Sequence, residues 1–360
     1  MNRVYNFSAG PSTLPLPVLE RAQKELVCYG DAGMSVMEMS HRSAPYQDII
    51  DSCEALVREL LGVSSRYKVL FLQGGASSQF AMVPLNLFGT VKKADYVLTG
   101  VWAKKAAKEA ARYGEVNIVA SSEDRVFNYI PSLDAAKFSK DAAYFHFTHN
   151  NTIYGTRFTD IPEPGDVPLV TDMSSSIFSQ VIDVDKYGII YAGAQKNMGP
   201  AGVTLVIVRE DLIGNALDIT PTMFNYQTHA DNGSMFNTPP CYAIYICKLV
   251  CEWLKNLGGV AEIEKINVHK AGILYDFLDN SKMFRPTVTN VKDRSIMNVP
   301  FVTGSDELNA KFIKEAAANG FVNLKGHRTV GGMRASIYNA MPVEGVEKLV
   351  AFMKDFEAKN

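Results

Sequence analysis

The chain has no excess of basic residues, because its 36 Lys and Arg residues stand against 38 Asp and Glu residues. Nucleic-acid binding proteins usually carry a clear basic surplus, so we expect no nucleic-acid partner. The sequence also contains no apolar run as long as a membrane span, and we expect no membrane association. These totals still leave room for a local basic pocket.

Cysteine is scarce as well: the chain has five, and none of them forms a CxxC pair. An odd number at loose spacing is poor material for a disulfide framework. Cys247 and Cys251, four positions apart in an apolar helical stretch, are expected to be small buried hydrophobes. The first residues, MNRVYNFSAGPS, lack the basic head and apolar core of a signal peptide. We therefore expect a reduced cytoplasmic protein, and we predict no metal site.

What the sequence does contain is an alternation of short apolar runs with helical patterns between residues 69 and 209, within a chain that is 47% hydrophobic. The expected strands cover residues 68–74, 94–100, 116–121, 143–149, 169–175, 188–194 and 202–210. Near-continuous apolar strands between helices indicate an α/β fold with a mostly parallel sheet that is covered on both faces. Only a short stretch joins the last two strands, which allows the final one to run antiparallel.

The pattern changes after Pro239. Residues 238–259 predict a long buried helix, and a second helical run follows to about Leu278. Beyond it, two strands and two helices form a compact α+β unit. We predict an N-terminal arm at 1–14 that packs on this second unit, a large domain at 15–265 and a small C-terminal domain at 266–360.

Residues after the expected strands are the first candidates for a site, because ligands collect at the carboxyl ends of parallel strands. GGASSQ (74–79) places a glycine pair at a helix start, where backbone N–H groups and the helix dipole favour a phosphate. A plain tight turn is the alternative, and the segment is not a P-loop. Trp102 opens the next helix, where it could stack on a planar ring or belong to the core.

The following strand ends carry polar and charged groups. Thr152 and Asp172 follow two apolar strands, and Asp172 is costly to bury without a partner, so it either serves a ligand or forms a cap or structural ion pair. Lys196 lies in GAQKNMGPAG, among glycines and alanines that leave room for other groups. A phosphate cradle, an aromatic plate, a carboxylate and an amine, in that order, are the parts that pyridoxal 5'-phosphate (PLP) requires.

Two basic clusters remain. MSHRSAPY (39–46) contains His41 and Arg42, and GHRTVGGMRAS (326–336) contains His327, Arg328 and Arg334. Arginine binds carboxylates and phosphates with two parallel hydrogen bonds, so several arginines in one pocket suit a substrate with two anionic groups. The alternative is a solvated surface.

Together these residues resemble the phosphoserine aminotransferases, which are class-V aminotransferases of PLP-dependent fold type I. The resemblance covers essentially the whole chain and rests on NFSAGPSTLP, MSHRS, FLQGGAS, TDMSSS, YAGAQKNMGPAG, the Asn–Thr–Pro at 237–239 and GHRTVGGMRASIYNA. It implies a mostly parallel seven-stranded sheet in a large domain, a small α+β C-terminal domain and a homodimer with shared active sites.

The resemblance also implies individual roles. Lys196 would form the Schiff base with PLP, Asp172 would pair with the ring nitrogen, and Trp102 would stack on the ring. Thr152 would contact the 3-hydroxyl, while Asn237 and Thr238 would reach the cofactor phosphate from the partner subunit. The other residues expected around that phosphate are Ala76, Ser77, Ser174 and Gln195. Arg334 would bind the substrate α-carboxylate, and the distal group would be surrounded by His41, Arg42, His327 and Arg328.

The implied reaction transfers the amino group of L-glutamate to 3-phosphonooxypyruvate, giving O-phospho-L-serine and 2-oxoglutarate by a ping-pong mechanism. A phosphorylated hydroxythreonine of pyridoxine biosynthesis is a second possible substrate. Some family members carry an arginine at the position of Ser77, where it helps to bind the substrate phosphate. This chain has serine there, so the distal phosphate would depend on the other basic residues.

Three other functions fit parts of the pattern. A cysteine desulfurase of the same fold would need a mobile catalytic cysteine, and none of the five lies in an obvious exposed Gly/Ser loop. An alanine–glyoxylate type transaminase would have little use for so many cationic side chains. A catalytically silent phosphate-binding protein on this fold would need neither Lys196 nor Asp172.

Overall fold

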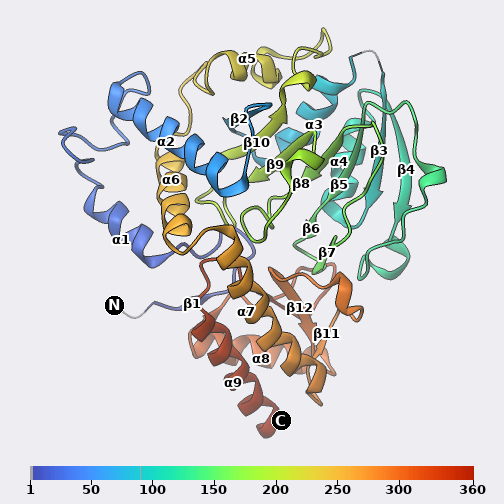
Figure 1. Ribbon diagram of the computed structural model, residues 1–360. Helices are drawn as coiled ribbons and strands as arrows, with labels where there is room; N and C mark the ends of the chain where they lie inside the picture. Colours follow the sequence, from blue (N-terminus) through green and yellow to red (C-terminus); the bar gives the residue numbers. More distant parts are fainter. Residues whose placement is uncertain (1–2, 90) are drawn as a thin grey trace.

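The computed structural model describes residues 3–89 and 91–360. Figure 1 shows a large α/β part built around one sheet and a smaller C-terminal part at one end of it. The helices are α1 Leu16–Lys24, α2 Ala44–Leu61, α3 Gly75–Leu87, α4 Val101–Ala110, α5 Tyr226–Asp231, α6 Cys241–Asn256, α7 Val260–Asn280, α8 Asp306–Ala318 and α9 Val343–Lys359. The strands are β1 Tyr5–Asn6, β2 Tyr67–Leu72, β3 Lys93–Leu98, β4 Glu115–Ser121, β5 Tyr144–Thr148, β6 Asn150–Asn151, β7 Thr156–Arg157, β8 Leu169–Asp172, β9 Ile189–Gly193, β10 Thr204–Arg209, β11 Arg285–Pro286, β12 Asn298–Val302, β13 Phe321–Val322 and β14 Met333–Ser336.

The large sheet explains the apolar runs of the sequence. Within the described residues it has seven strands in the order β2-β10-β9-β8-β5-β3-β4, and only β10 runs opposite to the other six. The short stretch between β9 and β10 cannot hold a crossover, so the chain turns back and β10 runs antiparallel. The predicted mostly parallel seven-stranded sheet of an α/β fold is confirmed.

Helices cover both faces of this sheet, as Figure 1 shows. Alternate residues of β10 face opposite cores: Leu205 packs with α2 and α6, whereas Val206 packs with α3 and α4. Burial on both faces is why these strands are apolar at nearly every position. In the described part of the chain, no helix combines the length and the apolar character needed to cross a membrane.

The C-terminal part has a core of its own. An antiparallel sheet of β11, β12 and β14 packs with α7, α8 and α9 around aromatic side chains such as Phe301 and Phe312. The N-terminal strand β1 pairs in parallel with β13, so the first residues of the chain are attached to this part. The predicted domain boundary at 265/266 falls inside α7, and the division into 1–14, 15–265 and 266–360 stays a prediction.

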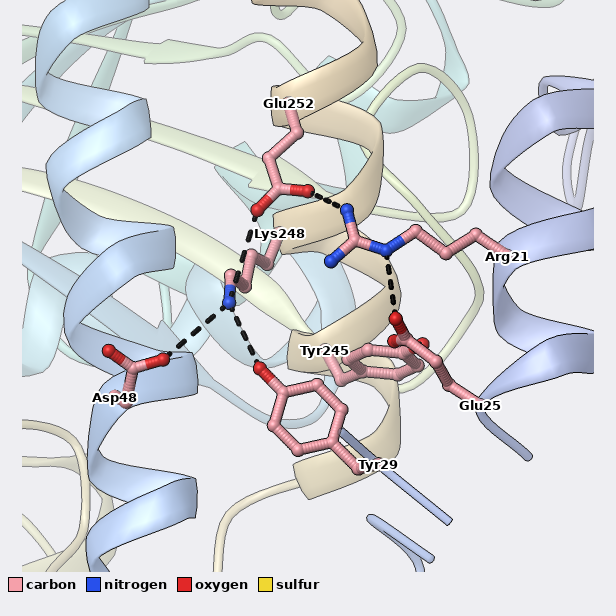
Figure 2. A network of polar contacts seen from close by, with 7 residues as sticks. All are labelled: Arg21, Glu25, Tyr29, Asp48, Tyr245, Lys248 and Glu252. Carbon is pink, nitrogen blue, oxygen red and sulfur yellow. Dashed lines mark hydrogen bonds and ion pairs between the residues drawn. The ribbon is translucent and has the colours of Figure 1, made fainter. Parts of the chain in front are cut away.

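A polar network joins α1, α2 and α6 beside the segment that leads to His41 (Figure 2). Its members are Arg21, Glu25, Tyr29, Asp48, Tyr245, Lys248 and Glu252. Lys248 lies at its centre: Nζ donates a hydrogen bond of 3.1 Å to the Tyr29 hydroxyl and lies 3.7 Å from Asp48 and 3.9 Å from Glu252. Arg21 bridges Glu25 and Glu252. The network therefore holds the chain between α1 and α2 against α6.

We expect Lys248→Met to lower the free energy of unfolding by about 1–3 kcal/mol, because Glu252 and the Tyr29 hydroxyl lose a cation that is almost wholly buried. Urea denaturation measures this loss. Lys255→Met is the matched control on the same helix: its partner, Glu59, is 2.7 Å away but exposed, so the change costs less than about 0.5 kcal/mol. Equal losses in the two variants would contradict the structural role of the network.

Candidate active site

The carboxyl ends of the parallel strands open onto a cavity of 450 Å³. The predicted site residues that line it are Ala76, Ser77, Trp102, Thr152, Asp172, Ser174, Gln195, Lys196, His327 and Arg334. They come from the loops after β2, β3, β5, β8 and β9 and from the C-terminal part of the chain. Ten residues that are spread over the sequence therefore meet in one place.

Lys196 follows β9 and extends into this cavity. Its Nζ donates a hydrogen bond of 2.6 Å to the hydroxyl of Thr152. Burial lowers the pKa of Lys196 to about 8; Asp172 opposes this shift and Arg334 adds to it. The neutral, nucleophilic form of the amine is therefore far more populated near neutral pH than it is in an ordinary lysine.

The small residues around Lys196 allow close packing. A Cβ on Gly10 would lie 3.3 Å from Cγ of Lys196, so the N-terminal segment rests directly on the lysine side chain. A Cβ on Gly199 would lie 2.6 Å from the sulfur of Cys247, so the turn after the lysine lies against α6. These contacts hold the lysine from two sides and direct it toward the cavity.

Asp172 is the last residue of β8 and is only 6% exposed. Its Oδ1 accepts a hydrogen bond of 2.9 Å from the backbone N–H of Ser174. Burial raises the pKa of Asp172, while Ser174 and the nearby Lys196 act in the opposite direction. With a second cationic group in the cavity, such as a protonated ring nitrogen, the carboxylate would gain the partner that a buried charge needs.

The glycine pair after β2 opens α3 beside the cavity. Gly74 has φ +90° and Gly75 has φ +65°, and a Cβ on Gly74 would overlap the hydroxyl of Ser78 at 1.9 Å. Position 74 therefore accepts no side chain. The first N–H groups of a helix have no acceptor within it, so the start of α3 at Ala76 and Ser77 presents free donors and a positive dipole end to the cavity.

Trp102 and Arg334 form the other walls. Trp102 lies in the first turn of α4 and packs, as Val330 does, against the cluster of Phe127, Ile153 and Tyr154. Arg334 lies on β14, and its Nη1 donates a hydrogen bond of 3.3 Å to the carbonyl of Thr152. Its Nε is buried and has no partner among the described residues. A buried donor without an acceptor is expensive, so this guanidinium is suited to an incoming carboxylate.

Five predicted site residues do not line the cavity of their own chain: His41, Arg42, Asn237, Thr238 and Arg328. Four of them belong together, because Nδ1 of His41 lies 3.3 Å from the hydroxyl of Thr238. The loop of Asn237 and Thr238 also lies near the glycine turn, where Gln73 Nε2 donates to the carbonyl of Thr238 at 3.4 Å. We refer to His41, Arg42, Asn237 and Thr238 as the outer cluster.

Several cavity residues were not predicted from the sequence. They are Ala9, Gly10, Thr148, Asn150, Ile153 and Ser175, whereas Gly74 and Gly75, which also line the cavity, are the predicted glycine pair. The hydroxyl of Ser12 also donates a hydrogen bond to the carbonyl of Lys196. Asn150 and Ser175 follow strand ends, so the rule that found Thr152 and Asp172 could have included them. Ala9, Gly10 and Ser12 carried a weaker signal, the motif SAGPS, to which no role was assigned.

Nearly the whole chain matches known proteins. The family model of class-V aminotransferases matches residues 4–349. A phosphoserine aminotransferase of Bacillus cereus is 59% identical over 360 residues, which is all of both chains. The phosphoserine aminotransferase of Listeria innocua is 60% identical over 358 residues, covering 99% of this chain and 97% of its own.

Solved structures agree with these relatives. A phosphoserine aminotransferase from Bacillus circulans superposes with a TM-score of 0.96 at 48% identity and covers 99% of each chain. A PLP-bound phosphoserine aminotransferase from Trichomonas vaginalis superposes with a TM-score of 0.93 at 37% identity and covers 98% of this chain and 100% of its own. The likeness therefore extends over the sheet, the cavity and the C-terminal part alike.

Proposed function

The chain belongs to the class-V aminotransferase family, and from this premise we propose that it transfers the amino group of L-glutamate to 3-phosphonooxypyruvate, giving O-phospho-L-serine and 2-oxoglutarate. The assignment is carried by full-length agreement with phosphoserine aminotransferases at about 59% identity. The cavity supports it independently, because a reactive amine, a buried carboxylate and a guanidinium whose Nε has no partner face one space.

The cofactor is PLP, and the residues present fit it. Donors at the start of α3 suit its phosphate, and the face of Trp102 suits its ring. Asp172 suits the ring nitrogen, and Lys196 Nζ suits the carbonyl carbon. When bound, PLP supplies a ring that withdraws electrons from the substrate Cα.

The residues of the chain have separate tasks in the reaction that we propose. Arg334 binds the α-carboxylate of the substrate with its unpaired guanidinium face. Lys196 Nζ takes the proton from the substrate Cα as a general base, for which a pKa of about 8 is well suited. Asp172 holds a proton on the ring nitrogen by offering a buried negative charge. His327 lies in the cavity wall and would contact the distal anionic group of the substrate.

We also propose a homodimer in which the outer cluster completes the active site of the partner subunit. Large apolar side chains are exposed beside it: Met37 is 61% exposed and Phe236 is 45% exposed. Exposed apolar side chains next to site residues are typical of a face that another chain covers. The contact between His41 and Thr238 means that one chain would deliver the cluster as a unit.

The cysteines help to decide between an aminotransferase and a cysteine desulfurase, and they indicate the cellular compartment. All five thiols are free, and no cysteine lines the cavity within the described residues. Three of them, Cys53, Cys247 and Cys251, are buried. A desulfurase needs a thiol that reaches the cofactor, so this arrangement favours the aminotransferase. Free thiols are also what a reducing compartment favours, which supports the cytoplasmic location that we propose.

The amino-transfer function is tested by its two half-reactions. We expect L-glutamate to convert the absorbance of the bound cofactor fully to that of its amino form, and 3-phosphonooxypyruvate to restore the original spectrum. Pyruvate, which lacks a distal anionic group, should restore the spectrum at least about tenfold more slowly because it makes no charge-assisted contact with the basic residues proposed for the distal group. No spectral change with glutamate, or equal rates with the two keto acids, would contradict the proposed reaction.

A further inference from the structure

Lys105 lies just outside the cavity and has no role in the reaction as described so far. It is exposed and belongs to α4, three residues after Trp102. Its Nζ lies 4.4 Å from the centre of the Trp102 ring. A cation over an indole face is attracted by the ring, so the ammonium group is held at the wall of the cavity rather than left free in solvent.

The neighbouring lysines of α4 are placed differently. Lys104 forms an ion pair with Glu123. No carboxylate lies within 4 Å of the ammonium group of Lys105 among the described residues. No carboxylate in the described part of the chain therefore neutralises Lys105, and the indole ring fixes the position of its ammonium group.

The glycine-rich loop at 326–332 packs on the same small cluster as the indole, because Val330 and Trp102 both lie against Phe127, Ile153 and Tyr154. The loop is closed by a hydrogen bond of 2.8 Å from Gly326 N–H to the Gly332 carbonyl. This turn carries His327 into the cavity wall. Burial lowers the pKa of His327, and Arg334, Arg328 and Lys105 lower it further. His327, Arg334, Arg328 and Lys105 therefore lie in one region of positive potential.

We propose that Lys105 is a specificity-determining residue, which favours substrates with a doubly charged distal phosphate over those with a singly charged distal carboxylate. The inference rests on the proposed function, because it concerns how the two substrates of that reaction are distinguished. The geometry behind it is the ammonium held on Trp102, which lines the cavity together with His327.

The expected preference follows from Coulomb's law. A fixed charge acts on a ligand in proportion to the ligand's charge, which is close to −2 for a phosphate monoester and −1 for a carboxylate at neutral pH. Removing the charge of Lys105 should therefore lower the logarithm of the association constant about twice as much for the phosphate ligand as for the carboxylate ligand. A purely structural role of the side chain would weaken both ligands alike.

Two ligands that cannot react allow a binding measurement on the PLP-loaded protein. 3-Phosphoglycerate and 2-hydroxyglutarate carry a hydroxyl group in place of the amine and differ in the distal anion. Calorimetric titration would compare wild type, Lys105→Gln, Lys105→Arg and Lys108→Gln at low and high salt. Lys108 is the matched control, because it is exposed and lies one turn further along α4.

In Lys105→Gln we expect the dissociation constant to rise about tenfold for 3-phosphoglycerate and about threefold for 2-hydroxyglutarate at low salt, and less at high salt. Lys105→Arg should restore both values, and Lys108→Gln should change them less than about twofold. Equal losses for the two ligands, no rescue by arginine, or the same effect from Lys108→Gln would overturn the inference. A wild-type protein that shows no spectral change with L-glutamate would instead refute the proposed function.

Discussion

Lys196→Ala should lower turnover with L-glutamate by at least about a thousandfold, because the chain loses both the amine that holds the cofactor and the base at the substrate Cα. The site offers no substitute in the described residues: the other basic side chains of the cavity wall are His327 and Arg334. Their positions suit anion binding, and arginine stays protonated at any working pH. Single-turnover absorbance of the loaded protein with glutamate measures the loss.

Lys186→Ala is the control for this variant, since Lys186 is exposed and lies away from the cavity. It should react like wild type. Borohydride reduction followed by peptide mapping should label Lys196 in wild type and in the control. A label on another lysine, or a Lys196→Ala protein that keeps its turnover, would refute the role of this amine.

Arg42→Ala should lower kcat/KM for phosphoserine about a hundredfold while the affinity for PLP stays within about twofold, because the variant loses the guanidinium that we propose binds the substrate phosphate with two hydrogen bonds. Arg42 is exposed and lies before α2, so its removal leaves the core intact. Stopped-flow half-reactions give the first value and a cofactor titration gives the second. Equal losses in both would place Arg42 at the cofactor rather than at the substrate.

A hybrid dimer shows which subunit's site Arg42 serves. Subunits with Lys196→Ala and subunits with Arg42→Ala carry different affinity tags, and mixed dimers are isolated with both tags. If the outer cluster acts in the partner subunit, one site of the hybrid is complete and about half of the wild-type activity returns. A hybrid as inactive as its parents would mean that Arg42 serves its own subunit, and a monomeric protein in solution would refute the dimer.

Local pattern was sufficient for most of the sheet. The strand expected at 202–210 is β10, Thr204–Arg209, and the short connection before it led to the antiparallel direction that the structure has. The helix expected from residue 238 begins at Cys241, after two prolines. Proline lacks an N–H donor and restricts the residue before it. A helix therefore begins more readily at the residue that follows such a pair than at a residue that precedes it.

Many of the site residues could be predicted from the same pattern of strands. Thr152, Asp172 and Lys196 lie where their strands end, and the structure brings all three to one cavity. The contact of Gly10 with Lys196 could not be predicted, because nothing in the sequence near Gly10 specifies which loop it meets. The position of Lys105 on Trp102 follows from helical spacing, but its neighbour His327 arrives from the other end of the chain.

The sequence by itself determined the α/β sheet, the direction of its last strand and the order of reactive residues along the strand ends, because apolar periodicity and short connections act locally. Tertiary structure alone decided that Arg334 returns to Thr152, that the N-terminal segment covers Lys196 and that the outer cluster lies outside its own cavity. These features arise because the packing of the two hydrophobic cores brings distant segments of the chain together. Only this packing buries Lys196, and the burial lowers the pKa of Lys196 to about 8.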